Sequence, residues 1–277
     1  MRNNIVTCDW VFEHLNDSDV RIIDTRFDLS NPLYGINEYI QGHIPGAFYF
    51  DLDKDLSSTS LKHGGRHPLP NIEPFVQKLS CAGIDETVKV VVYDEDGGMY
   101  SARFWWLLKY LGHDNIYILD GGFKEWRERG CLISQDVPLI QPKEFRSNIQ
   151  THMLVHIENV KEKMVRNDAV LLDARAYERF AGHVEPIDKK AGHIPGAQNA
   201  FWKNNYREDG KWKTIEELHT QYESLDRELQ YIVYCGSGVS ACPTIVALKE
   251  AGFKNVQLYV GSWSDWSSYD GNPIETK

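Results

Sequence analysis

The sequence contains no long hydrophobic run. Its start, MRNNIVTCDW, lacks the apolar core of a signal peptide, and nowhere do the roughly 18 consecutive apolar residues of a membrane-spanning helix occur. We therefore expect a cytoplasmic protein with no membrane partner. Basic clusters are also missing, since 30 Lys and Arg stand against 40 Asp and Glu, a net charge of −10. Nucleic acid is accordingly not an expected partner.

Cysteines are few, and they form no metal-binding pattern. The five are Cys8, Cys81, Cys131, Cys235 and Cys242, an odd number at irregular spacing. Disulfide frameworks use even numbers of cysteines in small secreted chains, so we expect reduced thiols here. A zinc site would need a further pair of Cys or His residues near Cys235 and Cys242, and there is none. No metal and no organic cofactor is expected.

The chain repeats itself. GHIPGA occurs at residues 42–47 and again at 192–197. VVVYDEDGG at 90–98 is matched by YIVYCGSGV at 231–239. The copies of every matched motif are offset by 140 to 150 residues, which indicates a duplicated unit.

Each copy alternates strand-like runs such as VRIID with helical patterns such as SARFWWLLKYLG. That alternation predicts an α/β fold, in which each copy forms a mostly parallel sheet flanked by helices. With 277 residues, 42% of them hydrophobic, the chain is long enough for two such domains. We predict one domain over residues 1–135, a proline-containing linker over 136–150 and a second domain over 151–277.

One cysteine lies where a reaction is expected. Cys235 follows the apolar run YIVY, and Gly236 and Gly238 precede a predicted helix over 241–251. Backbone N–H groups at such a strand-to-helix junction favour an anion at their focus, and a thiolate is an anion. A phosphatase loop would need Cys-x5-Arg to bind phosphate, but an alanine stands in place of that arginine. We interpret Cys235 as a nucleophile, and a structural disulfide with Cys242 is the alternative.

The two copies differ at the nucleophile. Asp94 occupies the position of Cys235 in the first copy, and its loop collects negative charge where an anion would bind. We therefore expect the first domain to be catalytically silent and the second to be catalytic. His43 and His193 are common to both copies, so we interpret them as turn and packing residues rather than metal ligands.

The tandem GHIPGA motifs, the single CGSGV loop and the closing GSWSDW resemble the two-domain rhodanese sulfurtransferases over essentially the whole chain. The residues Cys235-Gly236-Ser237-Gly238 are similar to the loop of the mercaptopyruvate branch, whereas the thiosulfate branch carries Cys-Arg-Lys-Gly. The resemblance implies tandem rhodanese-like domains and transfer of sulfane sulfur from 3-mercaptopyruvate through a Cys235 persulfide, with release of pyruvate. The acceptor would be cyanide or a thiol, either a small thiol or a thioredoxin-like protein. A thiosulfate:cyanide sulfurtransferase and a non-catalytic rhodanese-like binding module remain the alternatives.

The resemblance also implies a proton relay. Ser237, His67 in GGRHPLP and Asp53 in FYFDLDKDL match a Ser–His–Asp arrangement that serves the cysteine. The second copy has Lys203 in place of Asp53. The carboxylate therefore belongs to the first copy alone, and the resemblance implies that both copies contribute to the active site.

The resemblance further implies a substrate arginine. Arg179 in DARAYERFAGHVEP matches it, where the first copy has Ser30. Mercaptopyruvate enzymes usually carry a second arginine after the EP of this segment, but here Ile187 follows, and Lys189 or Lys190 would have to supply the charge. The remaining substrate-binding residues would be those of the cysteine loop, Gly236, Gly238, Val239 and Ser240.

Overall fold

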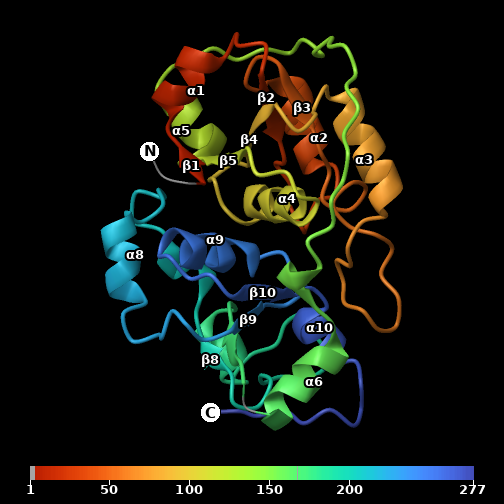
Figure 1. The fold of residues 1–277 in the computed structure, drawn as a ribbon, viewed down its shortest axis with the longest axis vertical. Coiled ribbons are helices and arrows are strands. Elements are labelled where there is room, and N and C mark those ends of the chain that lie inside the picture. Colours follow the sequence, from red (N-terminus) through yellow and green to blue (C-terminus); the bar gives the residue numbers. More distant parts are fainter. Residues whose placement is uncertain (1–3, 167) are drawn as a thin grey trace. The chain divides into compact units, whose positions relative to one another are not determined.

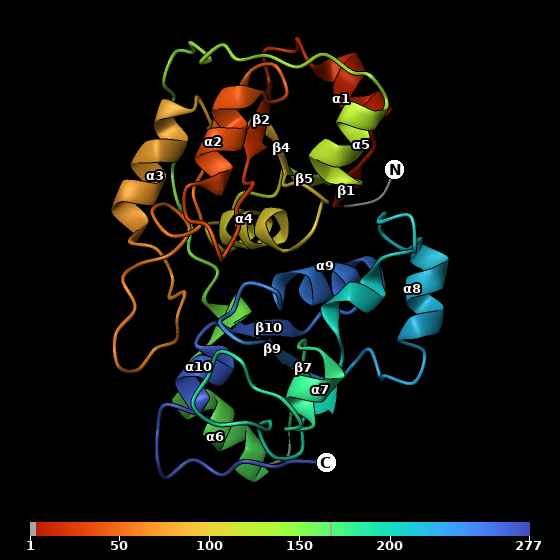
Figure 2. The same cartoon turned by 180° about the vertical axis from the view of Figure 1, so that it is seen from behind.

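The computed structural model describes residues 4–166 and 168–277, so residues 1–3 of the predicted first domain lie outside the described residues. The chain divides into two compact units, whose elements are drawn from two sides in Figures 1 and 2. The first unit consists of the chain up to Ser58, Pro70–Gln150 and Glu208–Trp212, and the second of Thr59–Leu69, Thr151–Arg207 and Lys213–Lys277. Each unit thus includes one short segment from the other half of the sequence.

The first unit is built on a parallel sheet that has five strands within the described residues. They are β1 (Ile5–Val6), β2 (Val20–Asp24), β3 (Ala47–Tyr49), β4 (Lys89–Tyr93) and β5 (Ile116–Leu119). They lie in the order β1-β5-β4-β2-β3, and each neighbouring pair is parallel. In the central strand β4, Val90, Val91 and Val92 are completely buried. Continuous β-branched runs of this kind are typical of strands that are covered on both faces.

Helices cover this sheet. They are α1 (Cys8–His14), α2 (Tyr34–Gln41), α3 (Ile72–Cys81), α4 (Met99–Tyr110) and α5 (Gly122–Glu128). α1 and α5 lie side by side in both views, and Val11 and Trp126 pack in one cluster with Val91 of β4. α4 packs against β4 and β5 and is buried along nearly its whole length.

The second unit repeats this topology. Its strands are β6 (Leu154–Val155), β7 (Val170–Asp173), β8 (Gln198–Asn199), β9 (Tyr231–Tyr234) and β10 (Val256–Tyr259). They lie in the order β6-β10-β9-β7-β8, again with parallel neighbours. β9 is central, as β4 is in the first unit. The predicted fold class, an α/β protein with parallel sheets flanked by helices, is confirmed.

The helices of the second unit are also arranged as in the first. They are α6 (Ile157–Arg166), α7 (Tyr177–Phe180), α8 (Ile215–Gln221), α9 (Cys242–Glu250) and α10 (Ser262–Trp266), with 3-10 turns at Thr151–Met153 and Trp202–Asn205. α6 lies beside α10 in both figures, and Val160 and Trp263 pack with Tyr234 of β9. α9 packs against β9 and β10, and α8 against α9. Among the residues that the structure describes, no helix is both long and apolar enough to cross a membrane.

The histidines of the repeated GHIPGA motif are packing residues. The buried ring of His43 stacks on Tyr39 at a centroid distance of 4.0 Å, and its Nδ1 lies 2.8 Å from the Tyr39 carbonyl oxygen. The buried ring of His193 stacks on Phe180 at 3.8 Å, and its Nδ1 lies 2.7 Å from the Phe180 carbonyl oxygen. The structural interpretation of both histidines is confirmed.

Residues 136–150, the predicted linker, belong to the first compact unit. Phe145 is buried there, and Lys143 Nζ lies 2.9 Å from Asp85 Oδ2. The assignment of this stretch as the boundary between two functional domains remains a prediction.

Candidate active site

Cys235 lies at the carboxyl end of the central strand of the second sheet. β9 ends at Tyr234 and α9 begins at Cys242, so residues 235–241 form the loop between them. Ligands of open parallel sheets bind at the carboxyl ends of the strands. The cysteine is only 1% exposed, and all five cysteines are free thiols. The predicted strand–cysteine–helix arrangement is therefore present.

Backbone hydrogen bonds hold Cys235 in place. The N–H of Gly238 donates to its Sγ at 3.1 Å, and its own N–H donates to Ser262 Oγ at 3.1 Å. Its carbonyl oxygen accepts the N–H of Trp263 at 2.9 Å. Gly238 has a φ of +80°, and a Cβ there would lie 2.4 Å from the carbonyl oxygen of Val260. Glycine is therefore required for the turn that aims this N–H at the sulfur.

The matching loop of the first unit holds a carboxylate in the same way. The side chain of Asp94 accepts the N–H of Gly98 at 2.7 Å and the N–H groups of Tyr100 and Ser101 at 3.0 Å each. Burial raises the pKa of Asp94, and these N–H groups partly offset the effect of burial. Within this chain, a loop of this design thus directs several backbone N–H groups at the side chain in the nucleophile position; nests of N–H groups favour anions in general.

Ser262 also contacts Cys235, and none of the sequence motifs predicts it. Its φ of +55° lies in the left-handed region, and among the described non-glycine residues it is the one with a positive φ. The equivalent residue of the first unit is Gly122, with a φ of +60°. Ser262 Oγ accepts the Cys235 N–H and donates to the carbonyl oxygen of Tyr259 at 2.8 Å. The one sequence feature that indicates a special role for Ser262 is the change from GG at 121–122 to GS at 261–262.

His67 belongs to the second unit, as part of the segment Thr59–Leu69. Its Nδ1 lies 2.8 Å from Ser237 Oγ, at hydrogen-bond distance. The segment is held by neighbouring contacts: the N–H of Gly64 donates to Asp265 Oδ1 at 2.7 Å, and the ring of His63 stacks on Tyr269 at 4.0 Å. The structure thus brings two members of the predicted relay together.

Asp53, the third member of the predicted relay, belongs to the first unit. It is exposed in the loop after β3, and its backbone N–H donates to Asp51 Oδ1 at 3.0 Å. Its part in the relay remains a prediction.

Arg179 is held by two carboxylates. Its Nη2 donates to Glu185 Oε1 at 2.6 Å and to Asp188 Oδ2 at 3.2 Å, and its Nε donates to Glu185 Oε2 at 3.3 Å. Burial raises the pKa of Glu185, but hydrogen bonds from Arg179 and from the backbone outweigh burial, so the net pKa lies below its ordinary value. Arg175 also contacts Glu185, and it is fully paired with Asp173 in the interior.

Arg66 also lies beside the cysteine loop, although no sequence motif predicts it. Its Nη1 donates to Asp188 Oδ1, and its backbone N–H donates to Ser264 Oγ at 3.1 Å. A Cβ added to Gly236 would lie 2.9 Å from Arg66 Nη2. The available signal was its position directly before His67 in GGRHPLP.

The other predicted residues lie as follows. Val239 is buried and its carbonyl oxygen accepts the N–H of Cys242 at 3.0 Å, whereas Ser240 is half-buried.

Ile187 is exposed. Lys190 Nζ donates to the carbonyl oxygen of Tyr269 at 3.1 Å, and Lys189 is exposed. Among the described residues no three His, Cys, Asp or Glu side chains gather as metal ligands would.

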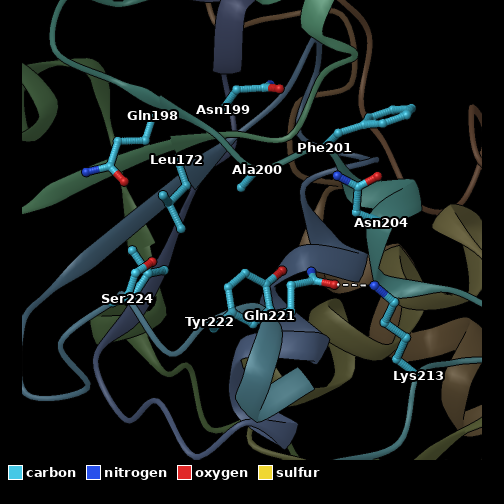
Figure 3. Close-up of a pocket in the computed structure, with 11 residues that line it drawn as sticks. Leu172, Gln198, Asn199, Ala200, Phe201, Asn204, Lys213, Gln221, Tyr222 and Ser224 are labelled. Carbon is cyan, nitrogen blue, oxygen red and sulfur yellow. Dashed lines mark hydrogen bonds between the residues drawn. The ribbon is translucent and has the colours of Figure 1, made fainter. Parts of the chain in front are cut away.

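A separate pocket of about 400 Å³ lies in the second unit. Figure 3 shows its lining, in which Lys213 Nζ donates to Gln221 Oε1 at 2.7 Å and Asn204 and Tyr222 are close by. Its lining includes none of the predicted site residues, so it is not the candidate active site.

Comparison with known proteins agrees with this architecture. The Rhodanese-like domain model matches residues 7–129 and 156–269. The chain is 39% identical, over 98% of both chains, to a "Probable 3-mercaptopyruvate sulfurtransferase" of Pseudomonas aeruginosa. It is 32% identical to the "Thiosulfate/3-mercaptopyruvate sulfurtransferase 2" of Arabidopsis thaliana, over 98% of this chain and 86% of that one.

A solved structure is similar as well. The crystal structure of SseA from Escherichia coli, described as a 3-mercaptopyruvate sulfotransferase, superposes with a TM-score of 0.81 at 33% identity. The match covers 94% of this chain and 98% of that one. The chain therefore belongs to the rhodanese family and is a sulfurtransferase with two rhodanese-like domains.

Proposed function

We propose that the protein transfers sulfane sulfur from 3-mercaptopyruvate, through a persulfide on Cys235, to a thiol or to cyanide. The observation that carries the proposal is the hydrogen bond of 3.1 Å from the Gly238 N–H to Cys235 Sγ. A backbone donor aimed at sulfur stabilises a thiolate and equally the negative charge of a persulfide. The 3-mercaptopyruvate sulfurtransferase names of the relatives support this donor.

The first step breaks one bond and forms another. The thiolate of Cys235 attacks the sulfur of the donor, an S–S bond forms, and the C–S bond of the donor breaks. The electron pair of the C–S bond stays on carbon, which leaves as the enolate of pyruvate and takes up a proton. Cys235 is left as a persulfide. An acceptor thiolate or cyanide then attacks the outer sulfur and regenerates the Cys235 thiolate.

Ser237 and His67 suit the proton transfer that this step needs. Their side chains lie 2.8 Å apart, and the serine is two residues from the nucleophile. A hydroxyl coupled to an imidazole can deliver a proton to the enolate carbon and be reprotonated by the histidine. Asp53 stays the predicted third member. The second loop is the catalytic one in this proposal, and the first, which already encloses Asp94, is silent.

The acceptor and the compartment belong to the proposal too. A free thiolate nucleophile suits a reducing cytoplasm, where a small thiol or a thioredoxin-like protein would be available as the acceptor. Subcellular fractionation and a comparison of acceptors at fixed donor concentration test these two points.

Thiosulfate is the second candidate donor, because the Arabidopsis relative carries both names. Thiosulfate is a dianion and releases sulfite, so it leaves no carbon to protonate. A cysteine phosphatase is disfavoured because Ala241, at the position of the phosphate-binding arginine, is an apolar buried residue.

The decisive experiment follows the cysteine by mass spectrometry. After addition of 3-mercaptopyruvate, the peptide with Cys235 should gain one sulfur atom while pyruvate is released. Cys235→Ser should abolish both, because a hydroxyl cannot carry sulfane sulfur, whereas Cys242→Ala is the control that keeps the nucleophile. Cys8 cannot replace Cys235 as the nucleophile, because its pKa is raised to about 12 and it stays a thiol at neutral pH. Burial is the main cause of this raised pKa, and the charge of Glu125 adds to it. Turnover in the Cys235→Ser variant would refute the proposal.

A further inference from the structure

One stretch of the second unit contacts both segments of the proposed proton relay. It comprises residues 261–269, which include α10. The N–H of Trp263 donates to the carbonyl oxygen of Cys235 at 2.9 Å. The next N–H along the chain, that of Ser264, donates to the carbonyl oxygen of Gly236 at 2.9 Å. Two backbone hydrogen bonds thus hold the cysteine loop against this stretch.

Side chains of the same stretch hold the segment that carries His67. Asp265 Oδ1 accepts the N–H of Gly64 at 2.7 Å. Ser264 Oγ accepts the N–H of Arg66, the residue before the histidine, at 3.1 Å. Ser264 therefore contacts the neighbour of the nucleophile through its N–H and the neighbour of His67 through its hydroxyl.

Asp265 is itself fixed in the interior of the second unit. It is only 4% exposed, and its Oδ2 accepts the hydroxyl of Tyr259 at 2.7 Å. A buried carboxylate needs hydrogen-bond donors, and the Gly64 N–H is the second of them. The two chain segments also approach closely, since a Cβ on Gly65, whose φ is +91°, would lie 2.6 Å from the carbonyl oxygen of Gly261. Glycine is required for this approach.

His63 adds a third contact between the two segments. Its Nδ1 lies 2.6 Å from Ser268 Oγ, and its ring stacks on Tyr269 at 4.0 Å. The Ser268 hydroxyl donates to the carbonyl oxygen of Asp265 at 2.6 Å, so Nδ1 of His63 must be the donor in the other hydrogen bond. Nδ1 can donate in the neutral ring and in the imidazolium alike. This contact therefore does not depend on the charge of His63.

The first copy has different residues at the positions that hold the segment. At an offset of 140 residues, Ser264, Asp265, Ser268 and Tyr269 are matched by Lys124, Glu125, Glu128 and Arg129. Glu125 forms an ion pair with Lys211, at 2.8 Å, instead. Trp126 and Trp266, by contrast, are common to both copies and are buried in the two cores. The four residues thus serve a contact that belongs to the second unit rather than to the shared fold.

We propose that Ser264 and Asp265 are positioning residues for the proton relay, because they hold the segment so that His67 Nδ1 meets Ser237 Oγ at 2.8 Å. Both act through His67, and neither is a catalytic residue. A displacement of about 1 Å at a reacting group can lower a rate roughly a hundredfold, so contacts away from the reacting atoms can control kcat. The proton transfer by His67 rests on the proposed function, whereas the placement of its ring does not require turnover.

Ser264→Ala gives the first kinetic test. It removes the acceptor of the Arg66 N–H and keeps the N–H that binds the cysteine loop. The kcat with 3-mercaptopyruvate should fall roughly tenfold, because fewer contacts then hold the histidine in place. Lys124→Ala, at the matching exposed position of the first copy, should behave as wild type. Thermal unfolding of both variants checks that the fold is kept.

Asp265 is tested by a disruptive and a conservative substitution. Asp265→Ala removes the acceptor of the Gly64 N–H, and kcat should fall roughly tenfold to a hundredfold. Asp265→Asn should recover most of this loss. Its amide oxygen can still accept the Gly64 N–H, and its amide nitrogen can donate to the Tyr259 hydroxyl. If Asp265→Asn is as slow as Asp265→Ala, the hydrogen bond to Gly64 is not what positions the segment, and the role of Asp265 is refuted.

A double substitution separates positioning from general damage to the site. In the His67→Ala background, Ser264→Ala should lower kcat by less than about twofold, because the group that it positions is already missing. An equal loss in this background and in the wild type would mean that Ser264 acts independently of His67, which would refute the positioning role.

A spectroscopic measurement separates this inference from the proposed function. In NMR spectra of the isotope-labelled protein without donor, the Nδ1 signal of His67, assigned by its loss in His67→Ala, should shift in Ser237→Ala. Ser264→Ala and Asp265→Ala should shift it in the same direction, because each weakens the same hydrogen bond. If 3-mercaptopyruvate proves not to be a donor but these shifts occur, the proposed function fails and the positioning role stands. If the signal stays at its wild-type position in both variants, the positioning role is refuted.

Discussion

At the scale of single residues, one side chain separates the two loops. Asp94 and Cys235 follow the central strands of their sheets, and both accept hydrogen bonds from the backbone N–H groups of their own loops. A carboxylate cannot carry sulfane sulfur, and the oxygens of Asp94 already occupy the donors of the first loop. We therefore attribute sulfur transfer to the second loop alone.

Ser262 gives a prediction at this scale. A left-handed backbone costs a non-glycine residue about 1–2 kcal/mol, and here the Oγ that orients Cys235 compensates for that cost. In Ser262→Gly the strain disappears together with the hydrogen bond, which contributes about 0.5–1.5 kcal/mol. The free energy of unfolding should therefore change little, while the rate of persulfide formation should fall, as stopped-flow mixing with donor would measure.

Two control variants accompany this test. Ser262→Ala keeps the strain and loses the hydrogen bond, so it should be both slower than wild type and less stable than Ser262→Gly. Ser262→Thr keeps the hydroxyl and should retain the faster rate if it folds. A Ser262→Gly enzyme as fast as wild type would mean that this hydrogen bond does not position the nucleophile.

At the scale of elements, strands and helices follow from local patterns. YIVY predicts β9 because a strand buried on both faces needs a continuous apolar run, and the matched motifs predict two sheets with one topology. The placement of Thr59–Leu69 with the second unit does not follow from such patterns. His67 contacts Ser237 across 170 residues, and no periodicity within GGRHPLP encodes a partner at that distance. The family resemblance points to His67, whereas the one signal for Arg66 is its position directly before His67 in GGRHPLP.

The contact between this segment and the cysteine loop gives the second prediction. Ser237→Ala and His67→Ala should each lower kcat/KM for 3-mercaptopyruvate by about 10²-fold or more, the usual contribution of a general acid. The loss with thiosulfate should be much smaller, because sulfite leaves without a carbon that must be protonated. Steady-state rates with both donors at one pH provide the comparison, and equal losses on the two donors would argue against a relay.

At the scale of the whole molecule, charge bears on the choice of donor. Arg66 and Arg179 are balanced by Glu185 and Asp188, so the cluster beside Gly236 carries no formal net charge. The single carboxylate of mercaptopyruvate can be bound by the directed N–H groups of the arginines alone. Thiosulfate is a dianion with a larger desolvation cost, and this cluster has no excess positive charge to offset it. This balance favours mercaptopyruvate over thiosulfate, for which the cysteine loop itself offers no cation.

The ion pair between Lys143, in residues 136–150, and Asp85 predicts that stability depends on pH. Burial raises the pKa of Asp85, but hydrogen bonds from Lys143 and Thr87 outweigh it and lower this pKa to about 2. A carboxyl group with a lowered pKa stabilises the fold above its ordinary value of 3.8, and this contribution is lost as the pH falls through about 2. Asp85→Asn should therefore be less stable than wild type at pH 7, and the difference should vanish near pH 2. Urea unfolding at several pH values measures it, with Glu128→Gln, at an exposed position of α5, as a surface control.

The exchange of short segments between the two units has a consequence for the gene. A duplicated chain is expected to separate into its two ancestral modules when it is cut between them. Here a cut within 136–150 would leave Cys235 on one polypeptide and the histidine and arginine of Thr59–Leu69 on the other. The second compact unit thus includes residues that the first copy of the sequence supplies. Shuffling of this C-terminal module alone into other proteins would carry along the nucleophile but neither His67 nor Arg66.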